Sequence, residues 1–399
     1  MIDICPLDKC TGCAACMNAC PKDAISMQEK GIMGYIYPVI NQDLCIDCHL
    51  CERTCPVNNP ISLAHPRKAF AAKCKDEKDL MTSTSGGASS AFVQYILSQD
   101  GVVYGCVQNN YTDIAHRRIE SSEEAYRLKG SKYVQSNIGY IYRTVKQDLQ
   151  KGIKVLFTGT PCQIAGLKKY LKKNYENLYL VDLVCHGVPS QHLLQENVRS
   201  MLNGKKSLPY VLFRKKGNSI DDLKFGTFLN DSQIKLSKQI FPNNDYIAAF
   251  MTGVIFRKNC FSCPYAQTLR GSDVTIADFW GLSKESAISD EKGVSLMLAN
   301  TEKGEALIRV VSTFCDIEER PILEAMSGNG QLQKPSKEPE YRDEFIALYA
   351  KDKKKAFSIY LKDYRIFYKR KQIKNKLRNI LLKNSTAFNC IKSVYKKIK

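Results

Sequence analysis

The first sixty residues hold two copies of one cysteine motif. Each copy reads C-x2-C-x2-C-x3-C-P, and Cys45 of the second copy lies 35 residues after Cys10 of the first. Three thiolates at this spacing wrap one iron–sulfur cubane, and the fourth, beyond a turn, reaches the neighbouring cluster. The proline behind each copy turns the chain at that point. The repeat therefore predicts two 4Fe-4S clusters, the first held by Cys10, Cys13, Cys16 and Cys55 and the second by Cys45, Cys48, Cys51 and Cys20.

Four further cysteines lie where expected strands end or loops turn, namely Cys162, Cys185, Cys260 and Cys263. Cys162 stands at the expected start of a helix, where backbone N–H groups and the helix dipole stabilise a thiolate. Two interpretations stay open. The four close a third cubane, or they are buried small hydrophobic residues, as free cysteines often are. Cys5 lies outside both repeats, and we expect a free thiol there.

Competing uses of so many cysteines fit the sequence less well. Zinc sites usually pair C-x2-C units across a longer gap than the one seen in these repeats. Disulfide scaffolds are short chains with an even number of cysteines, whereas this chain has 399 residues and 17 cysteines. Metal or redox chemistry in a reducing compartment is therefore the expectation.

The elements that position these residues follow from short apolar runs separated by turn signals. We expect strands at 35–44, 102–107, 153–159 and 178–185, a helix at 162–171, and another helix capped by Ser190. Alternating strands and helices indicate an α/β body. Ser83, Ser85, Gly86 and Gly87 precede an apolar helix that ends near Leu97. Such a turn suits a phosphate at the helix start, or it is an ordinary glycine-rich turn into a helix.

Most of the net charge of +19 sits in the C-terminal segment, since residues 351–399 carry +15. Aromatic and aliphatic residues recur there at helical spacing. One interpretation is a basic helix that docks by its apolar stripe, and another is a helix lying on an anionic membrane surface. Nucleic acid is not expected as a partner because no nucleic-acid motif accompanies the charge. The stripe comprises Phe357, Tyr360, Tyr364, Phe367, Tyr368, Ile373, Leu377, Ile380 and Leu381.

Neither a secretory signal nor a membrane span is expected. The opening MIDICPLD is acidic where a signal would be basic, and the longest uncharged run, 81–99, is too polar to span a bilayer. We therefore expect a cytoplasmic protein, with peripheral contact at the inner face of the membrane as one interpretation of the basic segment.

Two resemblances extend these inferences. Residues 1–60 resemble a bacterial dicluster ferredoxin, which implies two β–α–β halves and one-electron transfer. Residues 66–310 resemble the coenzyme F420 hydrogenase/dehydrogenase beta-subunit family through a series of spaced motifs. These motifs are TSTSGGASSAF around 83–92, LKGSKYVQS at 128–136, GTPCQIAGL at 159–167, DLVCHGVPS at 182–190, CFSCPY at 260–265 and DVTIADFWG at 273–281.

The family resemblance implies an FAD-binding iron–sulfur reductase. It assigns Ser85, Gly86, Gly87, Ser131, Lys132 and Tyr133 to the flavin region, and it places Cys162, Cys185, Cys260 and Cys263 on the family's cysteine motifs, in favour of the third cluster. The expected fold is α+β, with a dicluster ferredoxin-like domain at 1–60, family regions at 66–145 and 146–310, and a basic helical tail at 320–399 that matches no part of the family pattern.

Three functions are open on the sequence alone, and catalytic residues are not identifiable. The first is an oxidoreductase in which a flavin links one-electron clusters to hydride exchange with coenzyme F420 or another small acceptor. The second is an electron-transfer subunit that serves a partner enzyme, for which cell-surface polysaccharide biosynthesis is one setting. The third is a redox sensor or scaffold whose clusters are structural.

Overall fold

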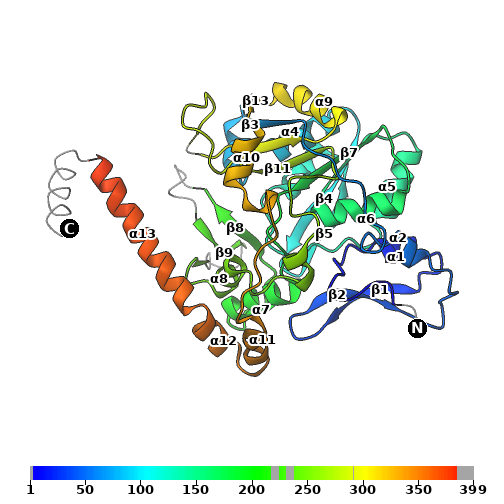
Figure 1. Ribbon diagram of the computed structural model, residues 1–399, viewed down its shortest axis with the longest axis horizontal. Helices are drawn as coiled ribbons and strands as arrows, with labels where there is room; N and C mark the ends of the chain where they lie inside the picture. Colours follow the sequence, from blue (N-terminus) through cyan, green and yellow to red (C-terminus); the bar gives the residue numbers. More distant parts are fainter. Residues whose placement is uncertain (1–2, 217–223, 231–237, 291, 384–399) are drawn as a thin grey trace.

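Figure 1 shows the computed structural model, which describes residues 3–216, 224–230, 238–290 and 292–383. The chain begins with a small module whose only described strands form one antiparallel hairpin, β1 (Ile25–Lys30) and β2 (Tyr35–Ile40). Two short helices, α1 (Ala15–Ala19) and α2 (Leu50–Thr54), pack together beside it. The residues before these helices, Ala14 and His49, both have left-handed backbones, so the sequence repeat is also a repeat of local geometry.

The body is built on a mixed sheet of eight strands, in the order β13-β3-β12-β11-β7-β6-β4-β5. The central strands β4, β6, β7 and β11 are parallel, and the pairs outside them are antiparallel. The strands are β3 (Lys68–Cys74), β4 (Val102–Asn110), β5 (Asp113–Ile119), β6 (Val155–Gly159), β7 (Leu178–Leu183), β11 (Val274–Asp278), β12 (Ser295–Ala299) and β13 (Cys315–Arg320). The predicted strands at 35–44, 102–107, 153–159 and 178–185 are thus confirmed, with shifted ends.

Helices cover both faces of this sheet because its strands alternate buried side chains between them. One face packs against α4 (Ala88–Leu97) and α9 (Glu302–Val310). The other face packs against α5 (Ile141–Gln150), α6 (Pro161–Leu171) and the N-terminal module. The predicted helix at 162–171 is α6, whose N-terminus is fixed by a capping box between Thr160 and Gln163.

A second sheet, absent from the sequence expectations, has the order β10-β9-β8. Its strands are β8 (Tyr210–Lys215), β9 (Lys224–Asn230) and β10 (Lys238–Ile240). It shares a core with α7 (Gln191–Leu202), α8 (Asp245–Thr252), α11 (Arg342–Lys351) and α12 (Lys353–Tyr360). As expected, Ser190 caps α7, and its side chain accepts a hydrogen bond from the Leu193 N–H.

The remaining described helices are α3 (Glu77–Thr82), α10 (Ile322–Gly328) and α13 (Lys362–Lys383), with 3-10 turns at Ser122–Leu128, Lys258–Ser262, Val311–Thr313 and Gly330–Leu332. The eight-stranded sheet takes strands from either side of residues 145 and 310, where the resemblance placed region boundaries.

The long helix α13 projects away from the body (Figure 1). Tyr364 and Tyr368 near its start pack on Phe241, with ring centroids 6.0 and 4.1 Å away, whereas Phe367 is 62% exposed. The predicted stripe residues beyond 374 lie outside the side chains that the structure describes. No described helix is both long and apolar enough to cross a membrane.

Candidate iron–sulfur site

The first predicted quartet surrounds one hollow in the N-terminal module. Cys10, Cys13, Cys16 and Cys55 line it together with mainly apolar neighbours, and all four are buried. Three of these cysteines come from the first motif, and Cys55 comes from the end of α2 in the second motif. The folded module therefore brings the fourth thiol of one repeat to the first three of the other, as the spacing predicts.

The second quartet surrounds a separate hollow at the more exposed end of the module. Cys20, Cys45, Cys48 and Cys51 line it with Ile25, Ile40 and Ile46 among others. Only Cys51 is buried, and the other three cysteines are half-buried. The two hollows thus differ in solvent access, since all four cysteines of the first are buried and only one of the second is.

Backbone N–H groups face the sulfur atoms of both hollows. The N–H of Ala24 lies 3.3 Å from Cys20 Sγ, and the N–H groups of Ala15 and Met17 hydrogen-bond the sulfurs of Cys13 and Cys16. Such N–H···S bonds stabilise negative charge on cluster ligands. Soft thiolates around an enclosed apolar space are the donor set that iron–sulfur clusters require. The residues present therefore fit a cubane in each hollow.

Cys5 also lies in the first hollow, although it belongs to neither motif. Its thiol hydrogen-bonds Cys10 and Cys55, which lowers the pKa of Cys10 to about 6 and that of Cys55 to about 7. Burial dominates at the deeper sulfurs and raises the pKa of Cys13 to about 12. A cluster in this hollow would stabilise the Cys13 thiolate, and its binding would release a proton.

The third set of cysteines also comes together, at the ends of three separate elements. Cys162 is the second residue of α6, Cys185 follows β7, and Cys260 and Cys263 lie in and after the 3-10 turn Lys258–Ser262. Burial is the largest cause that raises the pKa of each thiol, to about 11 for Cys162 and about 12 for Cys260. Repulsion from other members of the set adds to this rise at Cys162, Cys185 and Cys260. The Arg257 N–H donates to the Val188 carbonyl at 3.0 Å, which joins the segment after Cys185 to the turn that carries Cys260.

The third set adjoins the first hollow rather than the second. Helix α6 lies across the N-terminal module, and a Cβ atom on its Gly166 would be 3.0 Å from Cys13 Sγ. After burial, the charges of Cys162 and Cys13 are the next causes that raise the pKa of Tyr265, which places this ring near both groups. The three sets of thiols therefore follow one another from the exposed end of the module into the body.

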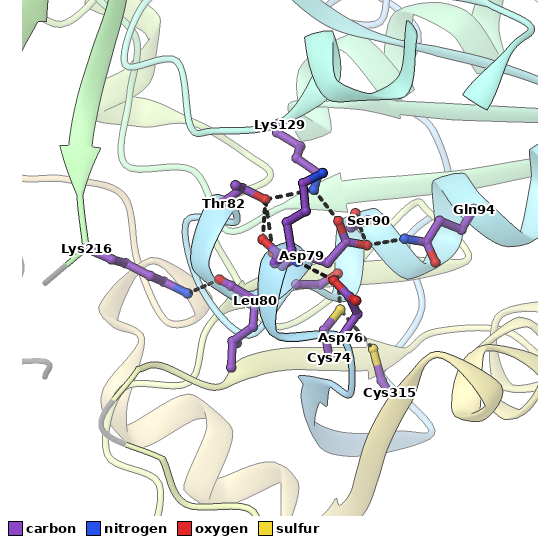
Figure 2. Close-up of polar contacts among 12 residues, drawn as sticks. Cys74, Asp76, Asp79, Leu80, Thr82, Ser90, Gln94, Lys129, Lys216 and Cys315 are labelled. Atoms are coloured by element: carbon purple, nitrogen blue, oxygen red, sulfur yellow. Dashed lines mark hydrogen bonds and ion pairs between the residues drawn. The ribbon is translucent and has the colours of Figure 1, made fainter. Parts of the chain in front are cut away.

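The loop for which the sequence left open an anion site or an ordinary turn lies between α3 and α4 and is held onto the sheet. Ser85 Oγ donates to the Val294 carbonyl at 2.9 Å, and Lys216 Nζ donates to the carbonyls of Leu80 and Ser85, each at 2.6 Å. A Cβ atom on Gly86 would lie 2.2 Å from the Ala72 carbonyl oxygen, so only glycine permits this packing. Figure 2 shows Lys216 reaching Leu80 in α3, just before this loop.

The residues of the neighbouring motif divide between two environments. The Ser131 N–H donates to Thr84 Oγ1 at 2.8 Å, which joins Ser131 to the loop. Lys132 Nζ instead donates to three carbonyls at the end of the turn Ser122–Leu128, and burial lowers its pKa to about 8. Tyr133 packs on Phe250 with ring centroids 4.7 Å apart. The side chains of Lys132 and Tyr133 thus make their contacts inside the protein rather than on the loop.

Some side chains at these sites carry no signal in the sequence. Cys5, Lys216 and Arg257 lie outside every motif, and only tertiary packing brings them to the thiols or to the loop. A lone Cys or Arg at the level of sequence gives no spacing pattern that could have identified it.

Comparison with known proteins identifies two regions of the chain. The 4Fe-4S dicluster domain matches residues 9–59, and the family described as the C terminus of the coenzyme F420 hydrogenase/dehydrogenase beta subunit matches residues 152–324. The first match covers both cysteine repeats, and the second covers the third set of cysteines.

Individual relatives are more distant. The F subunit of the F420H2 dehydrogenase of Methanosarcina mazei is 24% identical over 49% of this chain and 61% of its own length. Coenzyme F420-dependent sulfite reductase of Methanocaldococcus jannaschii is 24% identical over 85% of this chain and 52% of its own length. The chain thus spans less than two thirds of either relative.

A chain from a solved structure of the F420-reducing NiFe hydrogenase complex of Methanosarcina barkeri is 18% identical, with a TM-score of 0.45 over 68% of this chain and 90% of that one. The chain thus carries a 4Fe-4S dicluster domain at residues 9–59, and its residues 152–324 match the C-terminal domain of the coenzyme F420 hydrogenase/dehydrogenase beta subunit.

Proposed function

We propose that this protein is an iron–sulfur flavoprotein oxidoreductase that passes electrons between its ferredoxin-type clusters and a flavin, which exchanges hydride with a deazaflavin of the F420 type or another small acceptor. One observation carries the proposal. The thiols form an ordered series, from the exposed second hollow through the buried first hollow to the third set inside the body.

The chain's own residues would set the conditions for each transfer step. Cys20, Cys45, Cys48 and Cys51 would hold the outermost cluster near solvent. The quartet of the first hollow would hold the next cluster in an apolar lining that excludes water. Cys162, Cys185, Cys260 and Cys263 would hold a third cluster under α6. Each bound cluster would supply one-electron transfer.

The proposal also places an FAD near the loop at residues 83–87. A flavin accepts electrons singly and releases them as hydride, so it would join the clusters to a two-electron acceptor. The start of α4 supplies N–H groups, and Lys216 adds positive charge beside them. Ser85, Gly86 and Gly87 would shape this loop, Ser131 would extend it through Thr84, and Lys132 and Tyr133 would support it from inside the protein.

A second candidate is an electron-transfer subunit without a substrate of its own. Exposed apolar side chains favour it, because Leu44 and Ile46 beside the second hollow are 49% and 56% exposed. Apolar groups around a solvent-accessible cluster suit a transient redox partner. Along α13, exposed Phe367 and Ile373 among lysines would offer a further contact, either to a partner or to an anionic membrane surface.

Anaerobic purification followed by stepwise reduction separates these functions. We expect flavin to be released on denaturation, and reduced F420 to bleach the flavin and then the clusters of the native protein. Flavin that responds to dithionite but to neither reduced F420 nor a nicotinamide donor would favour the electron-transfer role. A protein with full cluster content and no flavin would refute the flavoprotein, and clusters that dithionite cannot reduce would point to a structural role.

A further inference from the structure

Arg257 is a buried arginine that lies between the first hollow and the third set of cysteines. Its side chain is 1% exposed and precedes the turn that carries Cys260. Its Nε atom donates to the Cys10 carbonyl at 2.8 Å, and its Nη1 atom lies 3.4 Å from Gln135 Oε1. These contacts fix the guanidinium against the loop that carries the first motif.

The guanidinium has no carboxylate partner among the residues that the structure describes. The comparably buried Arg270, by contrast, pairs with Asp182 at 2.9 Å. Arg257 Nη2 is buried and has no hydrogen-bond partner in the described chain. Arg257 Cζ lies 4.2 Å from the ring centroid of Tyr37 and 6.0 Å from that of Tyr35. The faces of these rings compensate part of its charge. Burying an unpaired cation is costly, so a negative group is expected beside it.

The Arg257 guanidinium lies close to thiols of both neighbouring sets. The largest cause that lowers the pKa of Cys10 is its bond from Cys5, and Arg257 lowers it further. The backbone also joins Arg257 to the third set, because the Cys260 N–H donates to the Arg257 carbonyl at 2.9 Å. Cysteines of the first hollow and of the third set therefore lie close to one fixed positive charge.

We propose that Arg257 is a positioning residue that raises the reduction potentials of the cluster in the first hollow and of the cluster held by the third set. This inference rests on the proposed function, because it assumes clusters at both places. A cluster gains one negative charge when it accepts one electron from its neighbour. A fixed cation in a region of low dielectric constant stabilises that reduced state more than the oxidised one.

Potentiometric titration of anaerobic holoprotein, followed by electron paramagnetic resonance, tests the proposal. Arg257→Gln removes the charge and should shift the ratio of reduced to oxidised first-hollow cluster at least tenfold towards the oxidised form, which is about 59 mV for one electron. Arg257→Lys keeps the charge and should shift the ratio less. Arg342→Gln is the control, since Arg342 is also buried but lies 3.5 Å from Glu338 and donates to the Phe256 carbonyl.

Equal potentials in the wild type and Arg257→Gln, with equal iron content, would overturn the inference. If Arg257→Gln fails to hold iron, Gln135→Glu tests the inference instead. A carboxylate at position 135 would pair with the Arg257 guanidinium and neutralise its charge without removing the side chain. An unchanged potential in Gln135→Glu would then overturn the inference, and a tenfold shift towards the oxidised form would support it. A wild type that holds no clusters refutes the proposed function instead, so the two failures are distinguishable.

Discussion

Replacing Gly87 by alanine should destabilise the protein through one identifiable contact. Gly87 caps the start of α4 with a left-handed backbone, at a φ of 90°. A Cβ atom there would lie 2.4 Å from Cys74 Sγ, which is buried and donates to the Gly87 carbonyl at 3.3 Å. Figure 2 shows Cys74 held against Cys315, whose sulfur is 3.5 Å away, so Cys74 has little room to move.

The expected loss has two parts. A left-handed backbone costs an alanine about 1–2 kcal/mol. Forcing a methyl group into a packed contact costs about 1–3 kcal/mol. The lower entropy of alanine in the unfolded chain returns about 0.4–1 kcal/mol. Gly87→Ala should therefore lower the free energy of unfolding by about 1–5 kcal/mol, by the same balance of terms.

Urea unfolding under anaerobic conditions, followed by circular dichroism, measures this loss. Gly152→Ala is the matched control, because Gly152 has a φ of 80° and nothing within 4 Å of its added Cβ atom. Its free energy of unfolding should stay within about 1.6 kcal/mol of the wild-type value, since only the backbone and entropy terms apply. The double variant Cys74→Ala/Gly87→Ala should regain the steric part. Equal losses in Gly87→Ala and Gly152→Ala would refute the reasoning.

Cys13→Ala should remove about four irons per chain and leave bound flavin unchanged; loss of both together would contradict separate sites. Burial lowers the pKa of His116 to about 4 from about 6.5 in the unfolded chain. The contribution of neutral His116 to the free energy of unfolding is therefore complete above pH 6.5 and falls by about 1.4 kcal/mol per pH unit towards pH 4. His116→Asn should flatten this dependence on pH in urea titrations. Deleting residues 371–399 should leave the visible spectrum and the urea midpoint unchanged, whereas deleting from 353 should lower the midpoint because Ala356 and Leu361 are buried in the core.

The sequence predicted most about the parts of the fold that are local. The cysteine repeats set which thiols share a hollow, because three ligands lie within seven residues and the turn after them fixes the fourth. Apolar runs such as 153–159 predicted buried strands because both faces of a central strand are covered. The loop that begins at Ser83 and the helix that ends at Leu97 followed from glycines and an apolar run.

Other features depended on contacts between distant residues. Within the described part of the chain, strands β8 to β10 pair only with one another, and they were not recognised from their apolar pattern. The aromatic stripe at 357–368 predicted one continuous helical face, but the chain divides at Leu361 into α12 and α13, and Phe367 faces solvent. The unpaired charge of Arg257 became visible only once the neighbours of its guanidinium were known.

The central claim is that each hollow of the N-terminal module holds a reducible cubane. Iron and acid-labile sulfide, together with spin integration after dithionite reduction, measure this directly in protein reconstituted without oxygen. We predict at least eight irons per chain, since each of the two clusters holds about four, and signals from two interacting spins. A well-folded sample that stays nearly free of iron and silent in the spectrum would contradict it.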